Sequence, residues 1–125
     1  MYRLLTLLAL LAAGTSHAYG PSVVEAQKIE YLITSVATLQ NAQFVRNGTS
    51  YDGKSAADHL RLKLKNAGSK IATVEDFIRL CGTGSSVSGI PYSIRFADGT
   101  TLNADLYFRQ KLALFTPVGD SRSIP

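Results

Sequence analysis

The pair Asn47-Gly48 is the sequence feature that most constrains the fold of this chain. An Asn-Gly pair supplies the positive φ angles of a tight hairpin turn, so residues 44–46 and 49–51 are predicted to pair as short antiparallel strands. Strands this short are not stable alone and need a helix to pack against. The rest of the chain should therefore supply helices around a small β element.

Helical spacing of apolar residues predicts the segments that could cover this hairpin. The predicted helices span 22–39, 55–67, 73–81 and 104–115. The first three each begin at a pair that fits a capping box: Ser22 with Glu25, Ser55 with Asp58, and Thr73 with Asp76. Gly68 is expected to end the second helix in a left-handed conformation.

A second β segment is predicted near the end of the chain. Tyr92, Ile94 and Phe96 alternate with polar residues, as in a strand with one buried face, and 100–102 can pair back after the Asp98-Gly99 turn. The sequence therefore predicts the α+β class: a small single domain of three to four helices with a short antiparallel β element.

The first residues have the pattern of a cleavable secretory signal. Arg3 is the positive region, 4–13 is an almost unbroken apolar run, and Ser16-His17-Ala18 has the small residues of a cleavage site. The apolar run is too short for a membrane-spanning helix, which needs about 20 residues. We expect cleavage after Ala18 and a periplasmic or secreted protein without a membrane span.

The remaining chain is long enough for one domain. We expect that domain to cover 19–115 and to be followed by a flexible tail, 116–125. Its single cysteine, Cys81, excludes an internal disulfide, so the thiol could pair with another chain, stay reactive or be packed away. The apolar residues before it in a predicted helix favour a buried thiol.

The charge pattern argues against a nucleic-acid partner. Residues 1–18 contain one charged residue, Arg3, so the mature form keeps 12 basic and 9 acidic residues. The basic residues are dispersed, there is no tryptophan, and aromatic and basic residues do not interleave as in a stacking platform.

Arg46 lies beside the predicted hairpin turn and has two possible roles. Its guanidinium could form a two-pronged pair with a carboxylate or phosphate ligand. Alternatively, it could pair with Asp52, Asp58 or a helix carboxyl end of the same chain and fix the hairpin.

His59 is the only histidine beyond the predicted signal. A Ser–His–Asp arrangement could be assembled from His59, one of Ser85, Ser86 and Ser88, and either Asp58 or Asp76. No Gly-x-Ser-x-Gly elbow singles out a nucleophile, so a hydrogen bond from His59 to a backbone carbonyl is the simpler interpretation. A lone histidine and a distant lone cysteine also lack the usual zinc ligand set.

The segment 82–89 is a glycine- and serine-rich loop. It follows a predicted helix, precedes a strand and lacks the lysine of a phosphate-binding P-loop. Its N–H groups and serine hydroxyls could bind an anion or a glycan hydroxyl, or the serines could satisfy their own backbone.

Four motifs of the chain resemble a known family. They are 44–48 (FVRNG), 59–64 (HLRLKL), 75–78 (EDFI) and 85–92 (SSVSGIPY). In this order and spacing they resemble the YfeK-like family of small exported bacterial proteins of unknown function. The resemblance covers about the middle half of the predicted mature chain and implies no activity.

The sequence thus favours a non-catalytic binding or interaction module of the cell envelope. The candidate ligand-binding residues are Arg46, Asn47, His59, Arg61, Ser85, Ser86, Ser88 and Tyr92. The partner could be a cell-wall fragment, an anion or another envelope protein, and no cofactor is implied. The alternatives are a small hydrolase that uses His59 with a loop serine, and an inhibitor of an envelope-attacking enzyme.

Overall fold

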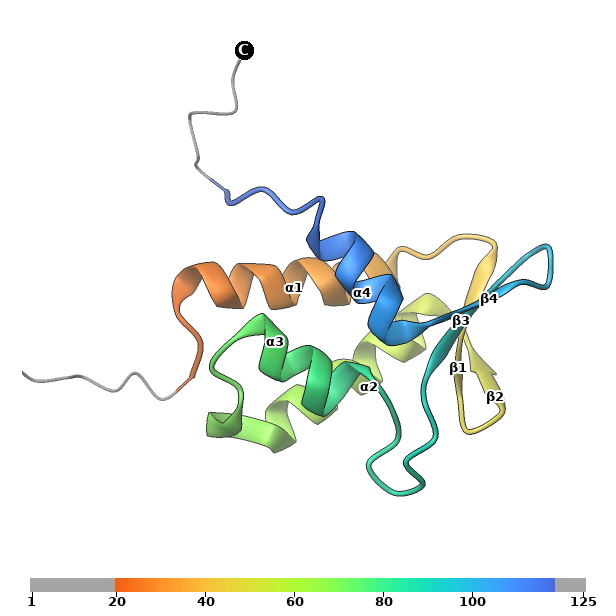
Figure 1. Ribbon diagram of the computed structural model, residues 1–125, viewed down its shortest axis with the longest axis horizontal. Coiled ribbons are helices and arrows are strands. Elements are labelled where there is room, and N and C mark those ends of the chain that lie inside the picture. Colours follow the sequence, from red (N-terminus) through yellow and green to blue (C-terminus); the bar gives the residue numbers. More distant parts are fainter. Residues whose placement is uncertain (1–19, 119–125) are drawn as a thin grey trace, which may run out of the picture.

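Helices and antiparallel strands alternate along the chain, with the helices packed together at one side and the sheet at the other (Figure 1). The computed structural model describes residues 20–118, so the predicted signal and most of the predicted tail lie outside the described residues. The helices are α1 (Val23–Ala37), α2 (Gly53–Ala67), α3 (Val74–Phe77) and α4 (Ala104–Leu112). The strands are β1 (Ala42–Arg46), β2 (Thr49–Tyr51), β3 (Ser93–Phe96) and β4 (Thr101–Asn103). This confirms the predicted α+β class.

The four strands form one antiparallel sheet in the order β2-β1-β3-β4. The predicted Asn47-Gly48 hairpin is confirmed, with positive φ at both turn residues. Strand β1 also pairs with β3, so that Phe44 lies opposite Tyr51 on one side and Ile94 on the other. The two hairpins therefore join into a single sheet, which the sequence pattern did not predict.

Helix α2 begins two residues earlier than predicted, at Gly53. The side chain of Asp52 accepts a hydrogen bond of 2.8 Å from the backbone N–H of Ser55, so Asp52 is the N-cap. The predicted capping box of Ser55 and Asp58 is therefore wrong. The predicted box of Thr73 and Asp76, by contrast, is present at the start of α3.

Helix α3 passes directly into a π-helical turn, η2 (Ile78–Gly82), and the two together form the predicted helix over 73–81. A short 3-10 turn, η1 (Gly68–Lys70), connects it to α2. Helix α4 ends at Leu112, earlier than the predicted end at Phe115.

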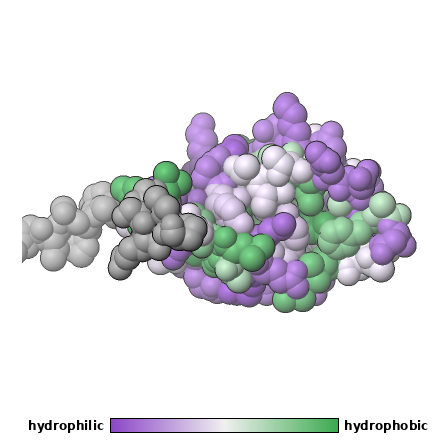
Figure 2. Space-filling view, turned by 90° about the horizontal axis from the view of Figure 1, so that it is seen from above, coloured by the Kyte–Doolittle hydropathy of each residue, from purple (hydrophilic) through white to green (hydrophobic). Residues whose placement is uncertain are grey.

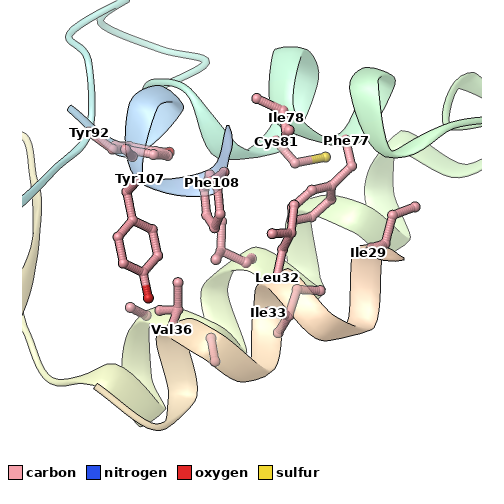
Figure 3. Close-up of a cluster of buried hydrophobic side chains, with 14 of the residues drawn as sticks. Ile29, Leu32, Ile33, Val36, Phe77, Ile78, Cys81, Tyr92, Tyr107 and Phe108 are labelled. Carbon is pink, nitrogen blue, oxygen red and sulfur yellow. The ribbon is translucent and has the colours of Figure 1, made fainter. Parts of the chain in front are cut away.

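The core lies between the four helices, the η2 turn and one face of the sheet, and Figure 3 shows part of it. The predicted stripe of α1 is fully buried and consists of Ile29, Leu32, Ile33 and Val36. The side chain of Cys81 is buried beside Phe77, as the sequence favoured, and burial raises the pKa of its thiol. Tyr107 reaches across to α1, where its hydroxyl donates to the Ser35 carbonyl oxygen at 3.0 Å.

The surface is mixed in character. In the view of Figure 2, hydrophobic side chains form separate groups divided by hydrophilic ones. Among residues 20–118, no helix is long and apolar enough to cross a membrane.

Candidate functional site

The glycine- and serine-rich loop 82–89, here called the serine loop, is hydrogen-bonded to the hairpin turn through the side chain of Asn47. The hydroxyl of Ser88 donates to Oδ1 of Asn47 at 2.6 Å, and the Asn47 Nδ2 donates to Oγ of Ser85 at 3.4 Å. Ser85 is only 6% exposed, and its Oγ also accepts from the backbone N–H groups of Val87 and Ser88. The Asn47, Ser85 and Ser88 side chains are thus engaged with one another and with the loop backbone.

Ser86 is exposed, whereas Tyr92 is buried. Ser86 is exposed at the edge of a shallow hollow that Lys63 and Lys70 also line. Tyr92 is 1% exposed, with its ring 5.2 Å from that of Phe44 and 6.5 Å from that of His59, centroid to centroid. The Tyr92 hydroxyl accepts from Nζ of Lys63 at 3.1 Å, so this tyrosine is a core residue with a satisfied polar end.

Arg61 lies on another side of α2 from His59 and connects two helices. Its guanidinium forms two hydrogen bonds of 2.7 Å to the carboxylate of Glu30 on α1. This contact lowers the pKa of Glu30. The structure therefore gives Arg61 an internal partner and leaves it outside the cavity described next.

A small cavity of about 190 Å³ lies between the first hairpin and α2. We call it the Arg46–His59 cavity, and its lining residues are Phe44 and Arg46 of β1, Tyr51 of β2, and Ser55, Ala56 and His59 of α2. Alternation along β1 places Phe44 and Arg46 on the same face of the sheet. On α2, Ser55 and His59 are one turn apart and share a face.

Two nitrogen atoms of residues that line this cavity are buried without a hydrogen-bond partner. They are Nε of Arg46 and Nε2 of His59, and the one other such side-chain atom within residues 20–118 is Oε1 of Gln27 on α1. Buried polar atoms of native proteins are nearly always paired, because an unpaired one costs about 1–3 kcal/mol. Both atoms belong to residues that line one cavity, so the guanidinium of Arg46 and the imidazole of His59 are the candidate contacts for a ligand from outside the chain.

The predicted internal partners of Arg46 are not found. Neither Asp52 nor Asp58 pairs with it, and within residues 20–118 no carboxylate oxygen lies within 4.0 Å of its guanidinium. Asp52 is instead occupied at the α2 N-terminus, where hydrogen bonds from Ser55 lower its pKa. In the part of the chain that the structure describes, the positive charge of Arg46 therefore has no paired carboxylate.

The surroundings of His59 favour its neutral form. Burial lowers the pKa of His59 below its ordinary value of 6.5, and the nearby charges of Arg46 and Lys63 lower it further. Lys63 holds its ammonium group between the Gly84 carbonyl oxygen, at 2.9 Å, and the Tyr92 hydroxyl. At neutral pH, the cavity thus presents one fixed cation beside an uncharged imidazole.

This arrangement does not contain an assembled catalytic triad. Within the described residues, neither ring nitrogen of His59 forms a hydrogen bond to a serine or a carboxylate, and the Ser85 and Ser88 hydroxyls are bound to Asn47. The same part of the chain contains no group of three histidine, cysteine or acidic residues placed to hold a metal ion.

The sequence interpretation did not select Phe44, Tyr51, Ser55 and Ala56 as lining residues. The signal that could have found two of them is periodicity, since Phe44 alternates with Arg46 and Ser55 precedes His59 by one helical turn. Tyr51 and Ala56 line the cavity because of the way the hairpin packs on α2, which no local sequence pattern predicts.

Comparisons with known proteins identify similar sequences without an assigned activity. A family model described as "Family of unknown function (DUF5329)" matches residues 23–116, which include every helix and strand of the structure. The uncharacterized protein YfeK of Salmonella typhimurium is 38% identical over 68 residues, which are 54% of this chain and 57% of that protein. The match thus spans little more than half the length of this curated relative. No solved structure matches the chain.

Proposed function

The chain belongs to DUF5329, a family of unknown function, and we propose that it is an exported binding module of the cell envelope. In this proposal, a small ligand occupies the Arg46–His59 cavity and the protein performs no chemistry on it. The observation that carries the proposal is a cavity lined by Arg46, which has no carboxylate partner within residues 20–118, and by His59; Nε of Arg46 and Nε2 of His59 are also buried without a hydrogen-bond partner.

The energetics of these two atoms support binding over a purely structural role. A structural arginine or histidine normally has its buried N–H groups paired, since each unpaired group costs about 1–3 kcal/mol. Here two residues that line the same cavity, Arg46 of β1 and His59 of α2, each have an unpaired buried nitrogen and carry this free-energy cost. A ligand with acceptor atoms would pair with the guanidinium of Arg46 and the imidazole of His59, which adds to its affinity.

The proposed export rests on the first 18 residues, with their positive, apolar and small-residue regions in the order of a secretory signal. A binding module is favoured over the hydrolase alternative because no serine is hydrogen-bonded to His59 within residues 20–118. The serine loop then has a structural role, because its hydrogen bonds to Asn47 stabilise the hairpin that forms one wall of the cavity.

The test is a thermal-shift screen of the protein produced from its full sequence, against muropeptides, organic and inorganic anions, sugars and an envelope extract. A ligand at about 100 times its dissociation constant adds ~2.7 kcal/mol of stability, a shift of several degrees for a domain of this size. We expect at least one of these classes to stabilise the wild-type protein.

Two variants and a matched control connect any hit to the cavity. Arg46→Met removes the unpartnered donor, and Ala56→Leu fills the cavity while keeping its charges. Arg95→Met is the control, because Arg95 is an exposed arginine of the same sheet that contacts Gln43 and Ser50 outside the cavity. Only the control should keep the shift. Equal shifts in all variants, or no shift with any class, would contradict the proposal.

A further inference from the structure

We infer that the ligand of the Arg46–His59 cavity is a small monocarboxylate with a short apolar group, its carboxylate held by the guanidinium of Arg46 and the imidazole of His59. This inference rests on the proposed function, namely that the cavity binds a ligand. It adds the chemical class of that ligand, which follows from the donors, the charge and the size of the cavity.

The donors of the cavity select a group that accepts hydrogen bonds. The guanidinium of Arg46 donates only, and His59 donates from Nε2 in one neutral tautomer and in its charged form. A carboxylate has two acceptor oxygens and no donor, so it can accept from the guanidinium and from the imidazole at once. Hydrogen bonds between charged groups are also about twice as strong as neutral ones.

The charge of the cavity selects a monoanion. Arg46 is the one charged side chain that lines it when His59 is neutral, and no lining residue is acidic. Lys63 contributes at a distance, but its ammonium group is already bound by Gly84 and Tyr92. A single carboxylate balances Arg46, whereas a phosphate dianion would leave a negative charge and further oxygens without donors.

The size and the remaining walls define the rest of the ligand. Phe44 and Ala56 are 1% and 3% exposed, and with Tyr51 they form the apolar part of the cavity lining. A protein cavity of about 150 Å³ can hold a benzene molecule, so about 190 Å³ accommodates a ligand of slightly more than six heavy atoms. Butyrate has this size, and so does the terminal alanine of a peptide.

The experiment compares four probes by calorimetric titration near neutral pH: butyrate, its uncharged analogue butyramide, inorganic phosphate, and N-acetylalanine. We expect the carboxylates to bind and butyramide to bind about tenfold more weakly, because it loses the charge-assisted hydrogen bonds. Phosphate should bind more weakly than either carboxylate. Tighter binding of N-acetylalanine than of butyrate assigns the source to a peptide carboxyl terminus, and the reverse order assigns it to free short-chain acids.

Variants and a spectroscopic signature locate the carboxylate. Arg46→Gln should abolish butyrate binding, whereas Arg95→Gln, at the outer face of the sheet, should retain it. The imidazole resonance that is absent in His59→Gln should shift on addition of butyrate and titrate at higher pH. Equal affinities for butyrate and butyramide, or an unchanged His59 resonance with bound butyrate, would overturn the inference.

The outcomes separate this inference from the proposed function. If another class, such as a sugar, stabilises the protein and loses its effect in Ala56→Leu while both carboxylates fail to bind, the binding module stands and the carboxylate is wrong. If no class binds in a manner sensitive to Arg46→Met or Ala56→Leu, both are wrong.

Discussion

The hydroxyl of Ser88 donates a hydrogen bond of 2.6 Å to Oδ1 of Asn47, a residue 41 positions earlier in the chain. Asn47 also has a positive φ of 51°, as its place in the hairpin turn requires. One side chain therefore serves both the local turn and the contact that holds the serine loop against it. These two roles can be separated by substitution.

Asn47→Gly should cost about 1–2 kcal/mol of unfolding free energy, because it keeps the turn conformation but removes the hydrogen bonds to Ser85 and Ser88. Asn47→Ala should cost more, since alanine is strained at positive φ. Urea unfolding of both variants measures the difference. If Asn47→Gly is as stable as the wild type, the contact with Ser88 does not stabilise the fold.

Gly53→Ala should destabilise the protein by about 1–3 kcal/mol, although alanine is the better helix former. A Cβ at Gly53 would lie 2.3 Å from the carbonyl oxygen of Val36 and 3.1 Å from that of Ala37. These backbone atoms end α1 and cannot move aside as a flexible side chain could. Asn66→Ala, at an exposed position of the same helix, is the control and should be neutral or stabilising. A stable Gly53→Ala variant would show that α1 and α2 are less closely packed.

Cys81 should resist thiol-reactive reagents in the native protein and react rapidly once the protein is unfolded. It is 1% exposed, and burial raises the pKa of its thiol, which lowers the fraction of reactive thiolate. Mass spectrometry after iodoacetamide treatment, with and without denaturant, measures this. A matched control places Val87→Cys, at a position that is 94% exposed, in a Cys81→Ala background. Equal reactivity of the two cysteines would contradict the buried position.

The contact between Glu75 and Arg109 should stabilise the fold at neutral pH, and the free energy of unfolding should fall in acid as this contribution is lost. The hydrogen bonds from Arg109 lower the pKa of Glu75 below its ordinary value of 4.5. A carboxyl whose pKa is lower in the folded state stabilises the fold above its unfolded pKa, and this contribution is lost as the pH falls through the folded value. Urea unfolding between pH 7 and pH 3 should therefore show a decline below about 4.5. The decline should be smaller in Glu75→Gln, and an equal decline in both proteins would exclude this pair as a cause.

Local signals were sufficient to predict most of the fold. The Asn47-Gly48 pair predicted its hairpin because two positive φ angles are needed there, and the helical stripe of α1 predicted its buried face. The start of α2 was wrong because Asp52 and Ser55 are both good N-cap residues, and sequence alone does not decide between them. Which of the two residues caps α2 depends on where the hairpin ends: β2 ends at Tyr51, so Asp52 lies directly before the first turn of α2.

The candidate site depended on contacts between elements that are distant in sequence. Helical spacing places Lys63 with the exposed residues of α2, yet Tyr92 and Gly84 bind its ammonium group. The sequence selected Arg46 and His59, but no local pattern reveals that their nitrogens lack partners. The lack of partners can be recognised only from the three-dimensional structure, which shows how β1 packs on α2 and where the carboxylates lie.

The absence of a partner at His59 leads to a prediction for the free protein. Its folded pKa is lowered by burial and by the charges of Arg46 and Lys63, and the ring of Tyr92 lies 6.5 Å from the His59 ring, centroid to centroid. Between the folded pKa and the unfolded value of 6.5, the unfolded chain binds more protons at this residue. The contribution of His59 to the free energy of unfolding should therefore be fully present above pH 6.5, and it should be lost as the pH falls through the pKa of His59 in the folded state.

The comparison of wild type with His59→Gln by urea unfolding from pH 8 to pH 5 tests this sign. The variant should lose the decline just below pH 6.5, a range in which carboxyl groups with an ordinary value of 4.5 contribute little. Saturating butyrate should remove the same decline from the wild type, because a bound carboxylate offsets the charge of Arg46 and stabilises protonated His59. A wild-type profile that is flat in this range without butyrate would show that His59 is not held neutral by its surroundings.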